Sequence, residues 1–155
     1  YSKAISVLSA IAGANDHKAA ILEHLPELQE LISAAASVKA GVVERDQFES
    51  GERRKLNLGH TFAHAIEWMA REKGDDISHG EAVSMGMVMA AHLAATLRRD
   101  FAACGLPVEC PYSISELVPA MKYDKKAEGE GVNFVLIHSI GDVRIEKLPV
   151  FFVSL

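Results

Sequence analysis

The sequence has few of the features that mark secreted or nucleic-acid-binding proteins. It contains only two cysteines among 155 residues, Cys104 and Cys110, and neither belongs to a CxxC motif. We therefore expect two free thiols in a reducing cytosol rather than a disulfide. The net charge of -5 argues against a nucleic-acid-binding protein, because such proteins usually carry an excess of basic residues.

Signals for export and for membrane insertion are also lacking. The chain does not begin with a basic segment followed by an apolar one, so we expect no signal peptide. The longest mostly apolar stretch, 82–97, contains Ser84, His92 and Thr96, which favours a buried helix over a membrane span. These features predict a cytoplasmic protein that associates with neither membranes nor nucleic acids.

Length and composition are typical of one globular domain. Hydrophobic residues make up 49% of the sequence and charged residues 24%, and 155 residues suffice for a substantial core. The chain begins with Tyr1, not Met, and directly in a helical pattern. We therefore expect residues 1–155 to form a single domain of a longer protein.

The order of apolar and turn-forming residues predicts a mainly α-helical domain with a small β-hairpin near its end. Apolar residues from Leu28 to Val42, including Ile32 and Val38, repeat with the period of a helix and give it one apolar face. The expected helices span 2–12, 16–25, 26–44, 57–73, 79 to about 99 and 113 to about 123. Residues 45–51 are charged and turn-like, and the expected strands span 132–138 and 143–148.

Histidines are concentrated in one part of the sequence. The segment LNLGHTFAHAIE places Asn57, His60, His64 and Glu67 at helical steps of three and four, so we expect these side chains to share one face. Histidines four residues apart on a helix lie about one turn apart. His60 and His64 could therefore converge on one point.

A third histidine begins the next helix. Ser78 and Glu81 form an S-x-x-E capping box, which places His79 in the first helical turn. There the helix dipole disfavours an imidazolium and keeps the ring neutral, as a metal ligand must be. Together with His60 and His64, this residue indicates a metal site, since catalytic zinc usually takes three protein ligands.

The spacing leaves the ligand set and the reaction open. The sequence lacks the HExxH motif of zinc proteases and the His-Asp dipeptide of helical metal phosphohydrolases. Glu67 and Glu81 are candidates for the carboxylate that orients a metal-bound imidazole. The histidines could instead be structural, in which case the chain would be a noncatalytic helical interaction domain.

Several basic residues precede the histidine helix or lie in polar loops. They are Lys39, Arg53, Arg54, Lys55, Lys122, Lys125 and Lys126. Cationic side chains beside a metal suit a phosphate or a carboxylate, although each of them singly could be a solvated surface charge. The Asn57 amide can orient a substrate hydroxyl, because it both donates and accepts hydrogen bonds.

Four segments, in order, resemble the C-terminal domain of the 3-dehydroquinate synthase family. They are KAGVVERD, ESGERRKLNLGHTFAHAIE, HGEAVSMGM and YDKK, the last of which precedes the expected hairpin. The resemblance covers residues 39–148, and the block 51–80 is its most specific part. Other sugar-phosphate cyclases share much of this block.

The resemblance implies the multi-helix C-terminal domain of a two-domain enzyme. The family's N-terminal α/β domain binds NAD and would be absent from this chain, so no residue here is assigned to NAD. The family's metal, Zn²⁺ or Co²⁺, is held by two histidines that match His60 and His79 and by a glutamate. That glutamate belongs to an A-E-x-x-K segment expected just before Tyr1. The full-length enzymes are commonly homodimers.

The resemblance also implies which residues bind and transform the substrate. His64 matches a position that contacts substrate near its phosphate rather than the metal. Lys39, Arg53 and Asn57 match positions that hold substrate hydroxyl, carboxylate or phosphate groups. We therefore expect catalytic roles for His64, Asn57 and Lys39.

The implied reaction converts 3-deoxy-D-arabino-heptulosonate 7-phosphate to 3-dehydroquinate and phosphate, a lyase step of the shikimate pathway of aromatic amino acid biosynthesis. A further anion-binding lysine of the family matches either Lys125 or Lys126. We expect the isolated chain to be inactive, because the NAD domain and one metal ligand would lie outside it. The alternative activities are those of other sugar-phosphate cyclases.

Overall fold

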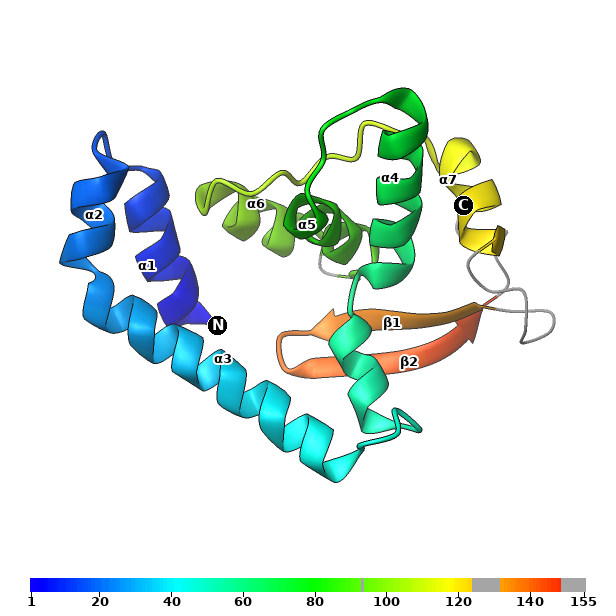
Figure 1. The fold of residues 1–155 in the computed structure, drawn as a ribbon, viewed down its shortest axis with the longest axis horizontal. Coiled ribbons are helices and arrows are strands. Elements are labelled where there is room, and N and C mark those ends of the chain that lie inside the picture. Colours follow the sequence, from blue (N-terminus) through cyan, green and yellow to red (C-terminus); the bar gives the residue numbers. More distant parts are fainter. Residues whose placement is uncertain (93, 124–131, 149–155) are drawn as a thin grey trace.

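The computed structural model describes residues 1–92, 94–123 and 132–148. Within these ranges the chain is mainly helical and ends in an antiparallel hairpin (Figure 1), which confirms the expected fold class. The elements are α1 (Ser2–Ala12), α2 (His17–Glu23), α3 (Leu25–Arg45), η1 (Glu52–Asn57), α4 (His60–Lys73), α5 (His79–Met89), α6 (Ala94–Ala103), α7 (Ile114–Tyr123), β1 (Val132–Ser139) and β2 (Asp142–Leu148).

Short polar side chains begin two helices as the sequence predicts. Asp16 accepts a hydrogen bond from the Ala19 amide (3.0 Å) at the start of α2. At α5, Ser78 and Glu81 form the expected reciprocal capping box. These bonds satisfy amide groups that have no acceptor within their own helix, so they fix where the helices begin.

The residues before α4 do not continue its helix, contrary to our prediction. Asn57 ends the 3-10 helix η1, and α4 begins only at His60. Between them Gly59 has a φ of 76°, a left-handed conformation that a residue with a side chain adopts only with strain. Asn57 is therefore not on the helical face that carries His60 and His64.

The helix expected over 79–99 is also interrupted, at residues 90–92. At the break the hairpin supplies backbone hydrogen bonds: Ile137 N donates to Ala90 O (3.1 Å), and His92 N donates to Ile137 O (3.0 Å). Strand-like pairing thus replaces helical hydrogen bonds where the sequence has neither Gly nor Pro. No helix in the described ranges is both long and apolar enough to cross a membrane.

The apolar face of α3 is largely uncovered. Val42 is buried, but Ile32 and Val38 are 67% and 65% exposed. The helix contacts α1 and η1, and Figure 1 shows it as a long element along the edge of the molecule. The apolar repeat therefore identified the helix but not what its face contacts.

The main core lies where α4, α5 and α7 meet the first strand. Its members include Phe62 and Ile66 of α4, Met85 of α5, Leu117 of α7 and Phe134 of β1, all at most 4% exposed. Burying a side chain of this size contributes about 1.5–3 kcal/mol. This core fixes α4 and α5 against each other, and these two helices carry the three histidines.

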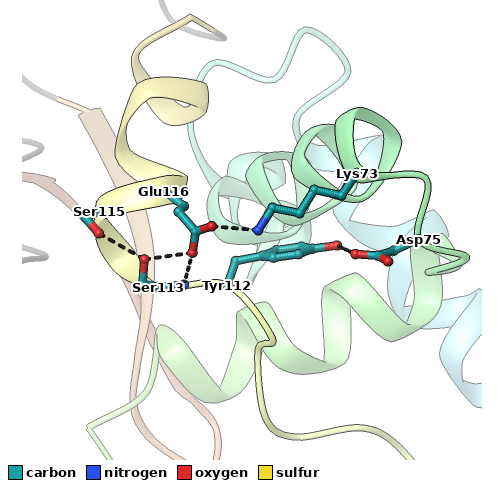
Figure 2. Close-up of polar contacts among 6 residues, drawn as sticks. All are labelled: Lys73, Asp75, Tyr112, Ser113, Ser115 and Glu116. Atoms are coloured by element: carbon teal, nitrogen blue, oxygen red, sulfur yellow. Dashed lines mark hydrogen bonds and ion pairs between the residues drawn. The ribbon is translucent and has the colours of Figure 1, made fainter.

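A cluster of polar side chains connects the C-terminal end of α4 with the beginning of α7 and the residues just before it (Figure 2). Lys73 pairs with Glu116 (2.6 Å), and its Nζ lies 4.8 Å from the centre of the Tyr112 ring. The Tyr112 hydroxyl donates to Asp75 (2.8 Å); burial and then this bond raise the pKa of Tyr112 to about 12. Hydrogen bonds from Lys73 and then Ser113 lower the pKa of Glu116 to about 2.

Candidate metal and substrate site

The three histidines singled out in the sequence lie together near the start of α4 and α5. The ring centres of His60 and His79 are 5.4 Å apart, and those of His60 and His64 are 5.7 Å apart. His60 is half-buried, whereas His64 and His79 are exposed. The fold thus brings imidazoles from two helices into one surface site.

Two glycines determine how closely α4 and α5 approach each other. A Cβ atom on Gly86 of α5 would lie 2.3 Å from the Gly59 carbonyl oxygen and 3.1 Å from the Ala63 nitrogen. Both neighbours are backbone atoms, which cannot move aside as the end of a flexible side chain can. Because Gly59 directly precedes His60, this close crossing determines where His60 lies relative to α5.

His60 and His79 each use Nδ1 for a hydrogen bond within the protein. His60 Nδ1 lies 3.1 Å from the Leu58 carbonyl oxygen, and His79 Nδ1 lies 3.0 Å from Glu67 Oε1. A carbonyl oxygen and an ionised carboxylate only accept hydrogen bonds, so Nδ1 carries the proton in each neutral ring. Each Nε2 then presents a lone pair to a ligand.

Of the two carboxylates expected to orient a histidine, Glu67 contacts an imidazole and Glu81 serves the helix cap. Glu81 Oε2 accepts from the Ser78 hydroxyl (2.6 Å) and from the Ser78 amide (2.8 Å). These two bonds, the hydroxyl first, lower the pKa of Glu81. The side chain of Glu81 is therefore committed to the start of α5.

The donor chemistry of His60 and His79 fits a zinc or cobalt ion. Imidazole nitrogen is a common ligand for such ions, and a bound histidine usually donates its other N–H to a carbonyl or carboxylate, as both rings do here. Within residues 1–92, 94–123 and 132–148, no group of three or more His, Cys, Asp or Glu side chains could hold a metal ion. A metal at this pair would therefore need a further ligand from elsewhere.

Asp46 organises the loop that leads from α3 to η1. Its carboxylate accepts from the backbone amides of Ser50, Gly51 and Arg53 at 2.9, 2.8 and 3.0 Å, and from the Ser50 hydroxyl at 3.0 Å. The amides of Arg53 and then Gly51 contribute most to lowering the pKa of Asp46. We did not identify Asp46 from the sequence, although an Asp followed by Ser and Gly is typical of turns.

Arg53 and Asn57 are held by contacts within the same part of the chain. Arg53 Nη1 donates to the Gln47 carbonyl oxygen (2.7 Å), and Asn57 Nδ2 donates to Glu49 Oε1 (2.6 Å). Glu49 has a φ of 56°, which is uncommon for a residue other than glycine. The contact of Glu49 with Asn57 was not predicted from the sequence.

The structure shows less about the lysines that we expect to bind anions. Lys39 is exposed in the second half of α3, the helix that leads into the loop of Asp46. Lys125 and Lys126 lie outside the described residues. Arg53 and Asn57 belong to η1, which precedes α4 in the chain, and their place in the site, like that of the lysines, stays a prediction.

A second histidine pair lies between the α5–α6 break and the hairpin. The ring centres of His92 and His138 are 4.6 Å apart, and His138 Nε2 is 2.7 Å from Glu146 Oε1. His92 and Glu146 also line a mainly apolar pocket of about 580 Å³. This pair was not predictable from the sequence, because pairing with β1 brings together residues that are far apart in the chain.

Comparison with known proteins agrees with the resemblance of the motifs. The family model described as 3-dehydroquinate synthase C-terminal matches residues 6–127. The 3-dehydroquinate synthase of Pyrococcus abyssi is 39% identical over 136 residues, which cover 83% of this chain and 40% of that protein. The 3-dehydroquinate synthase of Acidithiobacillus ferrooxidans is 42% identical over 143 residues, which cover 84% of this chain and 39% of that protein.

A third relative, the 3-dehydroquinate synthase of Lactiplantibacillus plantarum, is 37% identical over 138 residues, which cover 81% of this chain and 38% of that protein. The chain thus spans about two fifths of the length of the curated relatives it matches. The matched residues 6–127 make up most of the chain and include all three histidines and the loop of Asp46. The chain belongs to the 3-dehydroquinate synthase C-terminal family.

Proposed function

We propose that the chain is the metal- and substrate-binding part of a 3-dehydroquinate synthase. The full enzyme would convert 3-deoxy-D-arabino-heptulosonate 7-phosphate to 3-dehydroquinate and phosphate, a lyase reaction of the shikimate pathway. The observation that carries the proposal is the approach of His60 and His79, whose Nδ1 atoms both face acceptors. The family match supports it, since the named relatives are 3-dehydroquinate synthases.

His60 and His79 would hold Zn²⁺ or Co²⁺ through their Nε2 atoms. A divalent ion bound there supplies Lewis-acid polarisation of a substrate oxygen. The protein orients both rings through Nδ1, which faces the Leu58 carbonyl in His60 and the Glu67 carboxylate in His79. The further ligand would come from a part of the enzyme outside this chain.

Cationic and amide side chains would bind the anionic and hydroxyl groups of the substrate. Arg53 and Lys39 carry charges that suit its carboxylate or phosphate. The Asn57 amide can donate to a phosphate oxygen or orient a hydroxyl. Lys125 or Lys126 would add a further positive charge. Fixed donors of this kind stabilise negative charge as it develops during the reaction.

His64 would act on the substrate phosphate rather than bind the metal. It follows His60 by about one helical turn, and the two ring centres are 5.7 Å apart. An imidazole beside the metal site can donate a hydrogen bond to a phosphate oxygen or exchange a proton with it. This role keeps the three histidines in one site but divides them between two tasks.

The rest of the longer enzyme would bind NAD, which supplies the hydride chemistry. We assign no residue of this chain to NAD. The proposal includes a homodimeric full-length enzyme located in the cytoplasm. The thiols of Cys104 and Cys110 are not joined to each other, which suits a reducing compartment.

Calorimetric titration of the chain with zinc tests the metal site. His60→Ala and His79→Ala should each weaken zinc binding by about tenfold or more, because each removes one of the two imidazole ligands. His17→Ala, at an exposed histidine of α2, should bind like the wild type. Equal and negligible binding by all four proteins would favour a noncatalytic domain with structural histidines.

A substrate panel on the full-length protein tests the reaction. With NAD and zinc present, phosphate should be released from 3-deoxy-D-arabino-heptulosonate 7-phosphate. Turnover of another sugar 7-phosphate or of glucose 6-phosphate in its place would assign the protein to a different sugar-phosphate cyclase.

A further inference from the structure

We propose that Glu67 is a positioning residue that holds His79 in the Nδ1-protonated tautomer and so sets the metal affinity of the site. The inference rests on the proposed function for its metal, but the contact itself does not. Glu67 Oε1 lies 3.0 Å from His79 Nδ1, within ordinary hydrogen-bonding distance. The contact joins α4 to the first residue of α5.

The placement of Glu67 follows from helix geometry. It lies about two turns after His60 on α4, so both side chains are on the helical face that meets the start of α5. The Glu67 side chain is 29% exposed and that of His79 is 59% exposed. The carboxylate is thus the more sheltered partner, and it can hold a ring that would otherwise rotate in water.

The hydrogen bond decides which nitrogen of His79 can bind a metal. A neutral imidazole has one N–H donor and one lone pair, and an ionised carboxylate accepts only. Glu67 therefore keeps the proton on Nδ1 and leaves the lone pair on Nε2. Without this acceptor the ring exchanges between both tautomers and between orientations. The free energy needed to order the ring on metal binding then lowers the metal affinity.

The other carboxylate at the start of α5, that of Glu81, does not take over this task. Glu81 is committed to the amide and hydroxyl of Ser78 at the cap of α5. On His60 the equivalent acceptor is the Leu58 carbonyl, which belongs to the backbone and survives any side-chain substitution. Replacing Glu67 therefore changes the orientation of one histidine of the pair and leaves the other as its internal reference.

The test compares Glu67→Ala with Glu72→Ala, an exposed glutamate on the same helix. Both substitutions remove one negative charge from α4 and replace it with a strong helix former. Long-range proton–nitrogen NMR spectra report the tautomer of each imidazole without any metal, and His79→Ala assigns the His79 signals. Zinc titration of the same proteins supplies the second measurement.

We expect His79 to be Nδ1-protonated in the wild type and in Glu72→Ala. In Glu67→Ala its signals should show a mixture of tautomers, and zinc binding should weaken by about tenfold or more. Glu67→Gln keeps an acceptor oxygen with the same reach, so it should lose less affinity than Glu67→Ala.

An Nε2-protonated His79 in the wild type would overturn the proposal, as would unchanged spectra and affinity in Glu67→Ala. The two proposals fail separately. Zinc binding that depends on His60 and His79 but not on Glu67 removes only the role of Glu67. If no zinc binds, the metal site fails, and the tautomer spectra still decide whether Glu67 positions His79.

Discussion

Acceptors that are near in the sequence orient three side chains of the candidate site, those of Arg53, Asn57 and His60. The Leu58 carbonyl precedes His60 by two residues, and the carboxylate of Glu49 precedes Asn57 by eight. The bond between Glu67 and His79 differs, because it joins two helices and forms only when α4 and α5 pack together. At this position the orientation of a single ring depends on the tertiary fold.

The pairing of Glu116 with Lys73 and Ser113 gives the fold a specific pH dependence. The pKa of Glu116 is lowered from 4.5 to about 2, so the contribution of this carboxylate to the free energy of unfolding is complete above pH 4.5. That contribution is lost as the pH falls from 4.5 toward 2. Glu116→Gln should therefore lower the thermal midpoint at pH 6, and its difference from the wild type should shrink below pH 4.5.

Thermal unfolding followed by circular dichroism at a series of pH values measures this difference. Glu72→Gln, at an exposed position of α4, is the matched control. A gap between wild type and Glu116→Gln that stays constant from pH 6 to pH 3 would show that the carboxylate charge is not what stabilises the cluster.

At the scale of elements, the crossing of α4 and α5 is the feature that the candidate site depends on most. Gly86→Ala would place a Cβ atom 2.3 Å from the Gly59 carbonyl oxygen. Since the backbone must shift to accept it, we expect a loss of about 1–3 kcal/mol in the free energy of unfolding. Zinc affinity should fall as well, because the shift moves His60 relative to His79.

Gly80→Ala is the control for this prediction. Gly80 lies in the same helix, and a Cβ atom there would meet nothing within 4 Å. It should leave stability unchanged or raise it slightly, because alanine is a better helix former than glycine. Denaturant unfolding of both variants decides the matter, and equal stability would show that the helices can separate at little cost.

Elements with local signals were predictable from the sequence, and those determined by long-range contacts were not. Ser78 and Glu81 mark the start of α5 within four residues of sequence, and Gly141 marks the turn of the hairpin. The break after Met89 has no local signal, because its hydrogen bonds come from Ile137. The left-handed Gly59 was missed for a related reason, since a glycine within a helical pattern is not by itself a break.

At the scale of the whole molecule, the spacing of the histidines indicated a metal site but not whether the chain supplies all of its ligands. The motif segments predicted that His60 and His79 belong to one site, and the fold places their rings 5.4 Å apart. Glu67 was one of the two carboxylates named from the sequence as able to orient an imidazole. The Leu58 carbonyl and the loop held by Asp46 depend on backbone conformations that the sequence does not display. The exposed face of α3 shows the same limit, since a helical repeat says nothing about what covers it.

The incomplete ligand set leads to a prediction about activity. The described residues contain no group of three or more metal-binding side chains, and the chain spans about 40% of its relatives' length. Catalytic zinc usually needs three protein ligands, and the proposed reaction also needs NAD. We therefore expect no phosphate release by this chain alone, even with NAD and zinc added, whereas the full-length protein should release phosphate under the same conditions. Turnover by the 155-residue chain would show that His60 and His79 work with ligands and an NAD site of its own.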